Sequence, residues 1–117
     1  MTAMENREAE YVERMLSAAS HATSYINGMT KDAFLADPKT QDAVIMKLLV
    51  IGELAAHLLD EHPQFVANYP EIPWQKMKGM RNRMAHGYFE LDLEIVWETV
   101  QSAIPDLQTR LRSLSPE

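Results

Sequence analysis

Apolar residues recur at helical spacing through almost the whole chain, and this feature constrains the fold more than any other. In the segment 6–26, apolar side chains follow one another at intervals of three or four positions: Tyr11, Met15, Ala19, Ala22 and Ile26. No stretch alternates apolar and polar residues in the way that a half-buried strand does. The sequence therefore predicts an all-α protein.

Capping and breaking residues divide the pattern into separate helices. Asn27-Gly28 is typical of a helix end, Thr30 can cap a short helical turn, and Asp37-Pro38 is typical of a helix start. Asp92 can cap the last helix, and Pro105 should kink it. We predict main helices at 6–26, 38–60, 74–85 and 93–114, with a helical turn at 64–68. Such a set of helices predicts a four- to five-helix up-and-down bundle.

Gly52 lies inside the second predicted helix, where a glycine costs about 1 kcal/mol relative to alanine. Its neighbours on the same broad face are apolar: Val44, Ile45, Leu48, Ile51, Ala55 and Leu59. A glycine on the buried side of a helix allows the backbone of another helix to come close. We therefore expect a second helix to pack tightly at Gly52.

Length and composition limit the class of protein. A chain of 117 residues fits one domain, which we expect to span 1–117. The absence of cysteine excludes thiol catalysis, cysteine zinc sites and disulfides, and it suits a cytoplasmic protein. The charged N-terminal segment does not resemble a signal peptide, and charged residues interrupt the longest apolar run at 44–59. We expect neither a membrane span nor a cofactor.

Basic residues gather in one segment of an otherwise acidic chain. The formal net charge is −6, yet the segment 73–88 contains no acid and holds four basic residues: Lys76, Lys78, Arg81 and Arg83. A local basic patch on an acidic protein favours a focused site for an anionic ligand over general coating of nucleic acid. A solvated helix that happens to be basic would leave the same pattern.

Arg81, Asn82, His86 and Tyr88 form a compact polar motif in this segment. Because helical residues advance by about 100°, Asn82 and His86 should share a face, and the amide can reach the imidazole. Arg81 and His86 instead lie about 140° apart around an ideal helix. Either the helix breaks near Gly87, or a second copy of the helix in a symmetric dimer completes the site.

These residue types can together cleave RNA without a metal ion. A base must take the proton of the 2′-hydroxyl, a cation must stabilise the charge on the phosphorane, and an acid must protonate the leaving 5′-oxygen. Histidine can act as base or acid, and arginine offers a planar fork to phosphate oxygens. The same residues also have ordinary roles: a surface histidine at a helix end, a solvated arginine and a half-buried tyrosine.

The sequence resembles the HepT-like branch of the HEPN superfamily, whose hallmark is Arg-x4-His-x-Tyr. Here the hallmark falls on Arg81, His86 and Tyr88. The resemblance covers roughly residues 8–112, and further matching segments lie along the chain: Phe34, Gln41-Asp42-Ala43-Val44, Ile51-Gly52-Glu53, Ile72-Pro73-Trp74, Gly79-Met80-Arg81-Asn82 and Asp92 through Val96-Trp97. Together these segments are far more specific than the hallmark alone.

The resemblance implies a helical homodimer that acts as an RNA-cleaving toxin beside a minimal nucleotidyltransferase (MNT) antitoxin. It implies catalytic roles for Arg81 and His86, supporting roles for Asn82 and Tyr88, and addition of AMP to Tyr88 by the antitoxin. Glu53 matches a family position and is equally consistent with a partner of Arg81 or Arg83 and with a plain surface carboxylate.

The remaining basic side chains of the motif segment are expected to contact RNA: Lys76, Lys78 and Arg83. No metal ligands are expected. Two other functions remain open from the sequence. One is a non-catalytic HEPN module that binds RNA or a nucleotide, and the other is a structural partner of a nucleotidyltransferase.

Overall fold

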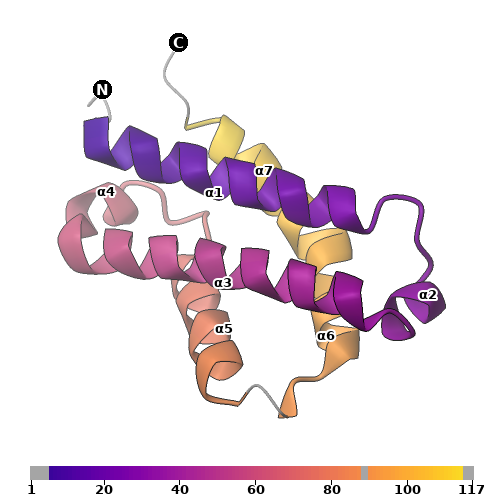
Figure 1. The fold of residues 1–117 in the computed structure, drawn as a ribbon. Coiled ribbons are helices and arrows are strands. Elements are labelled where there is room, and N and C mark those ends of the chain that lie inside the picture. Colours follow the sequence, from indigo (N-terminus) through magenta and orange to yellow (C-terminus); the bar gives the residue numbers. More distant parts are fainter. Residues whose placement is uncertain (1–5, 88–89, 115–117) are drawn as a thin grey trace.

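The computed structural model describes residues 6–87 and 90–114 of the chain, and the described part is almost entirely helical. It contains no strand. The elements, labelled in Figure 1, are α1 (Asn6–Tyr25), α2 (Lys31–Leu35), α3 (Pro38–Glu61), α4 (Pro63–Ala67), α5 (Trp74–His86), α6 (Leu93–Glu98), the π-helical turn η2 (Thr99–Ala103) and α7 (Ile104–Arg112). The predicted all-α class is confirmed.

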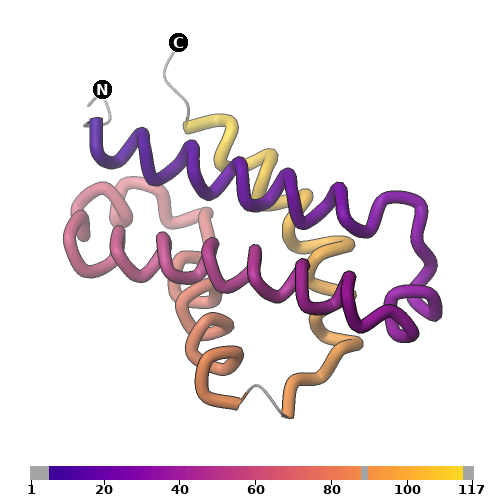
Figure 2. The backbone as a smooth tube through the Cα atoms, in the orientation of Figure 1, coloured from indigo at the N-terminus to yellow at the C-terminus, as the bar shows by residue number. Residues whose placement is uncertain are grey.

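The long helices run up and down, as the sequence predicts. Figure 2 shows that α1 and α3 lie side by side and run in opposite directions, with α2 in the connection between them. The chain then leaves α3 through α4, passes down α5 and returns through α6, η2 and α7. Within the described ranges, no helix is both long enough and apolar enough to cross a membrane.

Side-chain caps fix the helix starts where the sequence places them. The hydroxyl oxygen of Thr30 accepts a hydrogen bond from the Ala33 amide at 3.1 Å. The Asp37 carboxylate accepts hydrogen bonds from the Thr40 amide and hydroxyl, at 3.2 and 2.7 Å, and these bonds lower its pKa. Gly28, between α1 and α2, has a φ of +79°, which glycine adopts without strain.

The apolar stripes predicted on the long helices form one core. The apolar residues named above for the segment 6–26 are all buried, as are those of α3 except Leu59, which is partly exposed. The last helices contribute a further buried stripe: Val96, Val100, Leu107, Leu111 and Leu114. The rings of Phe34 and Trp97, 5.4 Å apart between centroids, join α2 to α6. Burial of these faces is the main source of stability for such helices.

The last predicted helix is interrupted by η2, immediately before α7. Pro105 has no amide hydrogen, so it cannot donate to the carbonyl of Gln101. The chain accommodates the proline with a π-helical turn at Thr99–Ala103 and places it in the first turn of α7, where a missing donor costs little. The irregularity predicted at Pro105 therefore lies in the turn before it.

Candidate active site

Helix α5, which carries most of the polar motif, packs directly on Gly52 of α3. A Cβ atom added at Gly52 would lie 2.5 Å from the Arg81 Cβ and 2.7 Å from the Met77 carbonyl oxygen. Such distances leave no room for any side chain larger than hydrogen. The close approach predicted at this glycine is confirmed, and it places the backbone of Arg81 against α3.

Gly52→Ala is expected to destabilise the protein by about 1–3 kcal/mol, because the new methyl group would force α3 and α5 apart. Gly79→Ala in α5 is the matched control. Its Cβ would meet nothing within 4 Å, so the ordinary helix preference for alanine should raise stability by about 0.5–1 kcal/mol. Urea unfolding of both variants measures the difference. Equal stability of Gly52→Ala and the wild type would contradict the packing.

Arg81 lies along α3 and forms an ion pair with Glu53. The Arg81 Nη1 donates to the Glu53 Oε1 at 2.6 Å, and the Arg81 side chain is 23% exposed. Its Nε is buried and makes no hydrogen bond within the part of the chain that the structure describes. Of the alternatives left open for Glu53, the geometry selects the pairing with Arg81. The carboxylate thus fixes the direction of a guanidinium that still reaches solvent.

Glu53 also belongs to a row of polar side chains along α3. Its Oε2 lies 3.8 Å from the His57 Nε2, and the His57 Nδ1 lies 3.8 Å from the Glu61 Oε2. The Tyr11 ring of α1 stacks on the His57 ring, with centroids 6.0 Å apart. Sequence reasoning missed His57, although the spacing of four residues between these groups was available as a signal.

His86 is the last residue of α5, and its side chain is exposed. The Gly87 amide donates to the Arg83 carbonyl at 2.8 Å and ends the helix, as expected. Asn82 is exposed as well, and no hydrogen bond joins it to His86 among the described residues. The predicted contact between the amide and the imidazole is therefore not formed. Both side chains lie in water, which satisfies their polar atoms without it.

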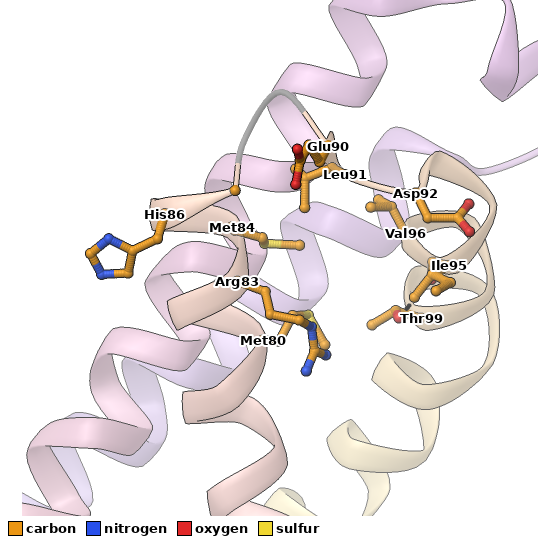
Figure 3. Close-up of a pocket in the computed structure, with 11 residues that line it drawn as sticks. Met80, Arg83, Met84, His86, Glu90, Leu91, Asp92, Ile95, Val96 and Thr99 are labelled. Carbon is orange, nitrogen blue, oxygen red and sulfur yellow. Dashed lines mark hydrogen bonds between the residues drawn. The ribbon is translucent and has the colours of Figure 1, made fainter.

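Arg81 and His86 point in different directions from α5. Arg81 faces α3, whereas Figure 3 shows the His86 ring turned away from the side chains that converge between α5 and α6. The helix continues through His86, so the break at Gly87 comes too late to turn the ring towards Arg81. The predicted break at Gly87 is present, but in the single chain it does not bring His86 to Arg81, which lies against α3 and pairs with Glu53. Tyr88 lies outside the described residues.

A model of the family described as ribonuclease HepT-like matches residues 15–114, which include most of α1 and every later helix. The chain belongs to the HepT-like ribonuclease family. No solved structure matches the chain.

Several archaeal and bacterial proteins resemble this HepT-like chain. It is 33% identical over 111 residues to "Probable ribonuclease HepT" of Thermococcus cleftensis, covering 95% of this chain and 98% of that protein. It is 42% identical over 82 residues to "Putative RNase MJ0127" of Methanocaldococcus jannaschii, covering 70% of this chain and 65% of the relative. It is 29% identical over 104 residues to "Putative RNase TTE0752" of Caldanaerobacter subterraneus, covering 89% and 90% respectively.

The other basic side chains of the HepT-like motif segment lie on two faces of α5. Lys78 is three residues before Arg81 and shares its face. Lys76 and Arg83 are seven residues apart and line the opposite side, towards η2 and α7. The candidate RNA contacts are therefore split between the side of Arg81 and a separate groove. Within residues 6–87 and 90–114, no three His, Asp or Glu side chains gather in a way that could hold a metal ion.

Proposed function

We propose that this chain is a metal-independent endoribonuclease, the toxin of a toxin–antitoxin pair, and that two copies build its active centre. One observation carries the proposal. Arg81 is held against α3 by Glu53, whereas His86 is exposed at the end of the same helix and faces elsewhere. Family membership and the ribonuclease names of the relatives support RNA as the substrate.

The exposed His86 imidazole takes the proton of the RNA 2′-hydroxyl, whose oxygen then attacks the neighbouring phosphorus. The Arg81 guanidinium stabilises the negative charge that develops on the phosphorane oxygens. The imidazolium formed in the first step then gives this proton to the leaving 5′-oxygen, so each site uses one His86 together with the Arg81 of the other copy. The products are a 2′,3′-cyclic phosphate and a free 5′-hydroxyl. No step requires a metal ion.

A two-fold axis beside the exposed face of α5 brings the groups of this mechanism together, because each copy then supplies what the other lacks. Asn82, exposed beside His86 on that face, supports the site through contacts with the partner or with RNA. Lys78 lies on the Arg81 side and adds positive charge for the incoming phosphate. The homodimer is therefore part of the catalytic proposal.

Glu53 acts in this proposal as a positioning residue for Arg81. The 2.6 Å contact holds the guanidinium along α3, and the Glu53 side chain is 54% exposed. An RNA phosphate can approach the remaining N–H groups of the fork, because an arginine offers five donors and Glu53 engages one of its nitrogens. The ion pair also partly neutralises Arg81, so RNA competes with Glu53 for the cation.

The partner in this proposal is an MNT-type nucleotidyltransferase, which transfers AMP to Tyr88. The motive is the family motif and the position of Tyr88 two residues after His86. The added phosphodiester carries negative charge to the basic residues of α5 and excludes RNA phosphate from them. Mass spectrometry of the Tyr88 peptide, after co-expression with such an enzyme, tests this point. An unmodified Tyr88 in fully neutralised protein would indicate inhibition by complex formation.

Purified protein incubated with total RNA in EDTA tests the proposed function. The expected result is cleavage that chelator does not reduce, with cyclic-phosphate and 5′-hydroxyl ends. Cleavage that stops in EDTA and returns with Mg²⁺ would contradict metal independence. RNA that is bound but never cleaved would instead favour the non-catalytic HEPN module.

A further inference from the structure

A groove separates α5 from the returning helices α6, η2 and α7. It contains two adjoining cavities of about 440 and 550 Å³, which share Met80, Arg83 and Thr99 in their walls. The first cavity lies near the end of α5, and its rim includes His86. The second lies further along α5, between Lys76 and Ala103. We refer to the two cavities together as the α5–η2 groove.

The floor of this groove is apolar and its rim on α5 is basic. Met80, Met84 and Ile95 line the cavity next to His86, and Ile95 is 59% exposed, which is unusual for so large an apolar side chain. Figure 3 shows these side chains converging from α5 and α6. Arg83 borders both cavities and Lys76 borders the second. Glu90 and Asp92 border the first cavity from the side of α6, so the groove offers apolar contact with positive charge along α5 only.

The π-helical turn forms one wall of the second cavity through Thr99 and Ala103. A π-helical turn is a rare interruption of an α-helix that occurs frequently at functional sites. Here it sets the wall of the groove that faces Lys76 and Arg83. The Thr99 hydroxyl donates a hydrogen bond to the Ile95 carbonyl, one turn earlier in the helix, at 2.7 Å. The irregularity that accommodates Pro105 thus forms part of the groove wall.

We propose that the α5–η2 groove binds unpaired RNA bases next to the cleavage site, with the flanking phosphates on Arg83 and Lys76. This inference rests on the proposed ribonuclease function. The thioether of Met80 and the apolar floor suit the flat aromatic face of a base, because sulfur–aromatic contacts are favourable. The rim cations suit the sugar–phosphate backbone better than the apolar face of a protein helix.

The proposal names the class of substrate, which is single-stranded RNA. Bases in a duplex are paired and stacked, so they cannot enter a lateral groove, whereas unpaired bases can turn outwards. His86 borders the first cavity, although its ring turns away from it, so bases held in the groove would belong to nucleotides that flank the phosphate at His86. Duplex RNA would contact only Arg83 and Lys76 at the rim, through its phosphates, and not the apolar floor.

The test uses fluorescently labelled 2′-O-methyl oligonucleotides, which lack the attacking hydroxyl and cannot be cleaved. Single-stranded, duplex and abasic forms of equal length are titrated into the whole protein by fluorescence anisotropy. The abasic strand keeps the phosphates but lacks the bases. The single strand should bind about three- to tenfold more tightly than the abasic strand for each base that the groove holds. It should also bind more tightly than the duplex.

Ala103→Trp fills the second cavity and should remove the advantage of bases, while Ser102→Trp leaves it intact. Both positions are exposed on η2, but only Ala103 lines the groove among the described residues. Gly79→Phe fills the same cavity from α5 and serves if Ala103→Trp does not fold. Helical circular dichroism checks the fold of each variant. Arg83→Gln should weaken all strands alike and lower the salt slope by about 0.7.

Equal affinity for abasic and base-carrying strands would overturn the proposal, and so would an unchanged base preference in Ala103→Trp and Gly79→Phe. A loss of dimer in Ala103→Trp, measured by sedimentation with RNA binding unchanged, would assign the groove to a second copy of the chain. Cleavage plays no part in these titrations. An absence of nuclease activity would therefore contradict the proposed function but would leave the measured preference for base-carrying strands unchanged.

Discussion

His86→Ala is expected to lower the rate of RNA cleavage in EDTA by about 10²–10⁴-fold, because the variant loses the group that moves the proton. Stability should change by no more than about 0.5 kcal/mol, since the side chain is exposed and packs on nothing that the fold needs. Single-turnover cleavage of a labelled RNA and thermal unfolding measure the two effects.

His21→Ala is the matched control for this prediction. His21 is also exposed on a helix, but it lies on α1 and stacks on Tyr25, with ring centroids 6.4 Å apart. Its replacement should leave cleavage unchanged. A His86→Ala protein that is folded and cleaves at the wild-type rate would remove His86 from the mechanism. A similar loss in both variants would point to a contaminating nuclease.

The helix boundaries could be predicted from the sequence because capping residues act on neighbours only a few positions away. Thr30 and Asp37 cap the starts of α2 and α3 and Gly28 follows the end of α1, each as the sequence predicts. The close packing at Gly52 was also foreseeable, because a glycine on an apolar helix face has few other uses. The π-helical form of the break before Pro105 was not foreseeable, since it depends on how the last helix packs on the others.

The site could be predicted only in part. The sequence placed Arg81 and His86 on different sides of one helix, and the structure agrees. It could not decide the partner of Glu53, because Arg81 lies 28 residues away and the pairing depends on the packing of α3 on α5. The expected contact of Asn82 with His86 failed because spacing alone does not outweigh hydration of two exposed polar groups.

Mixing two inactive variants tests most directly whether two copies share each active centre. Arg81→Ala and His86→Ala are purified separately, mixed in equal amounts and allowed to exchange subunits. Each mixed dimer then holds one site with an intact arginine from one copy and an intact histidine from the other. About half of the dimers are mixed and one of their two sites is restored, so about a quarter of the wild-type activity should return.

Labelled subunits and native mass spectrometry confirm the exchange, and each variant alone supplies the background rate. The shared centre predicts that cleavage in EDTA rises from this background to about a quarter of the wild-type rate as mixed dimers form. Mixed dimers that form fully and stay as inactive as the separate variants would contradict it, and would place Arg81 and His86 of each site within one chain.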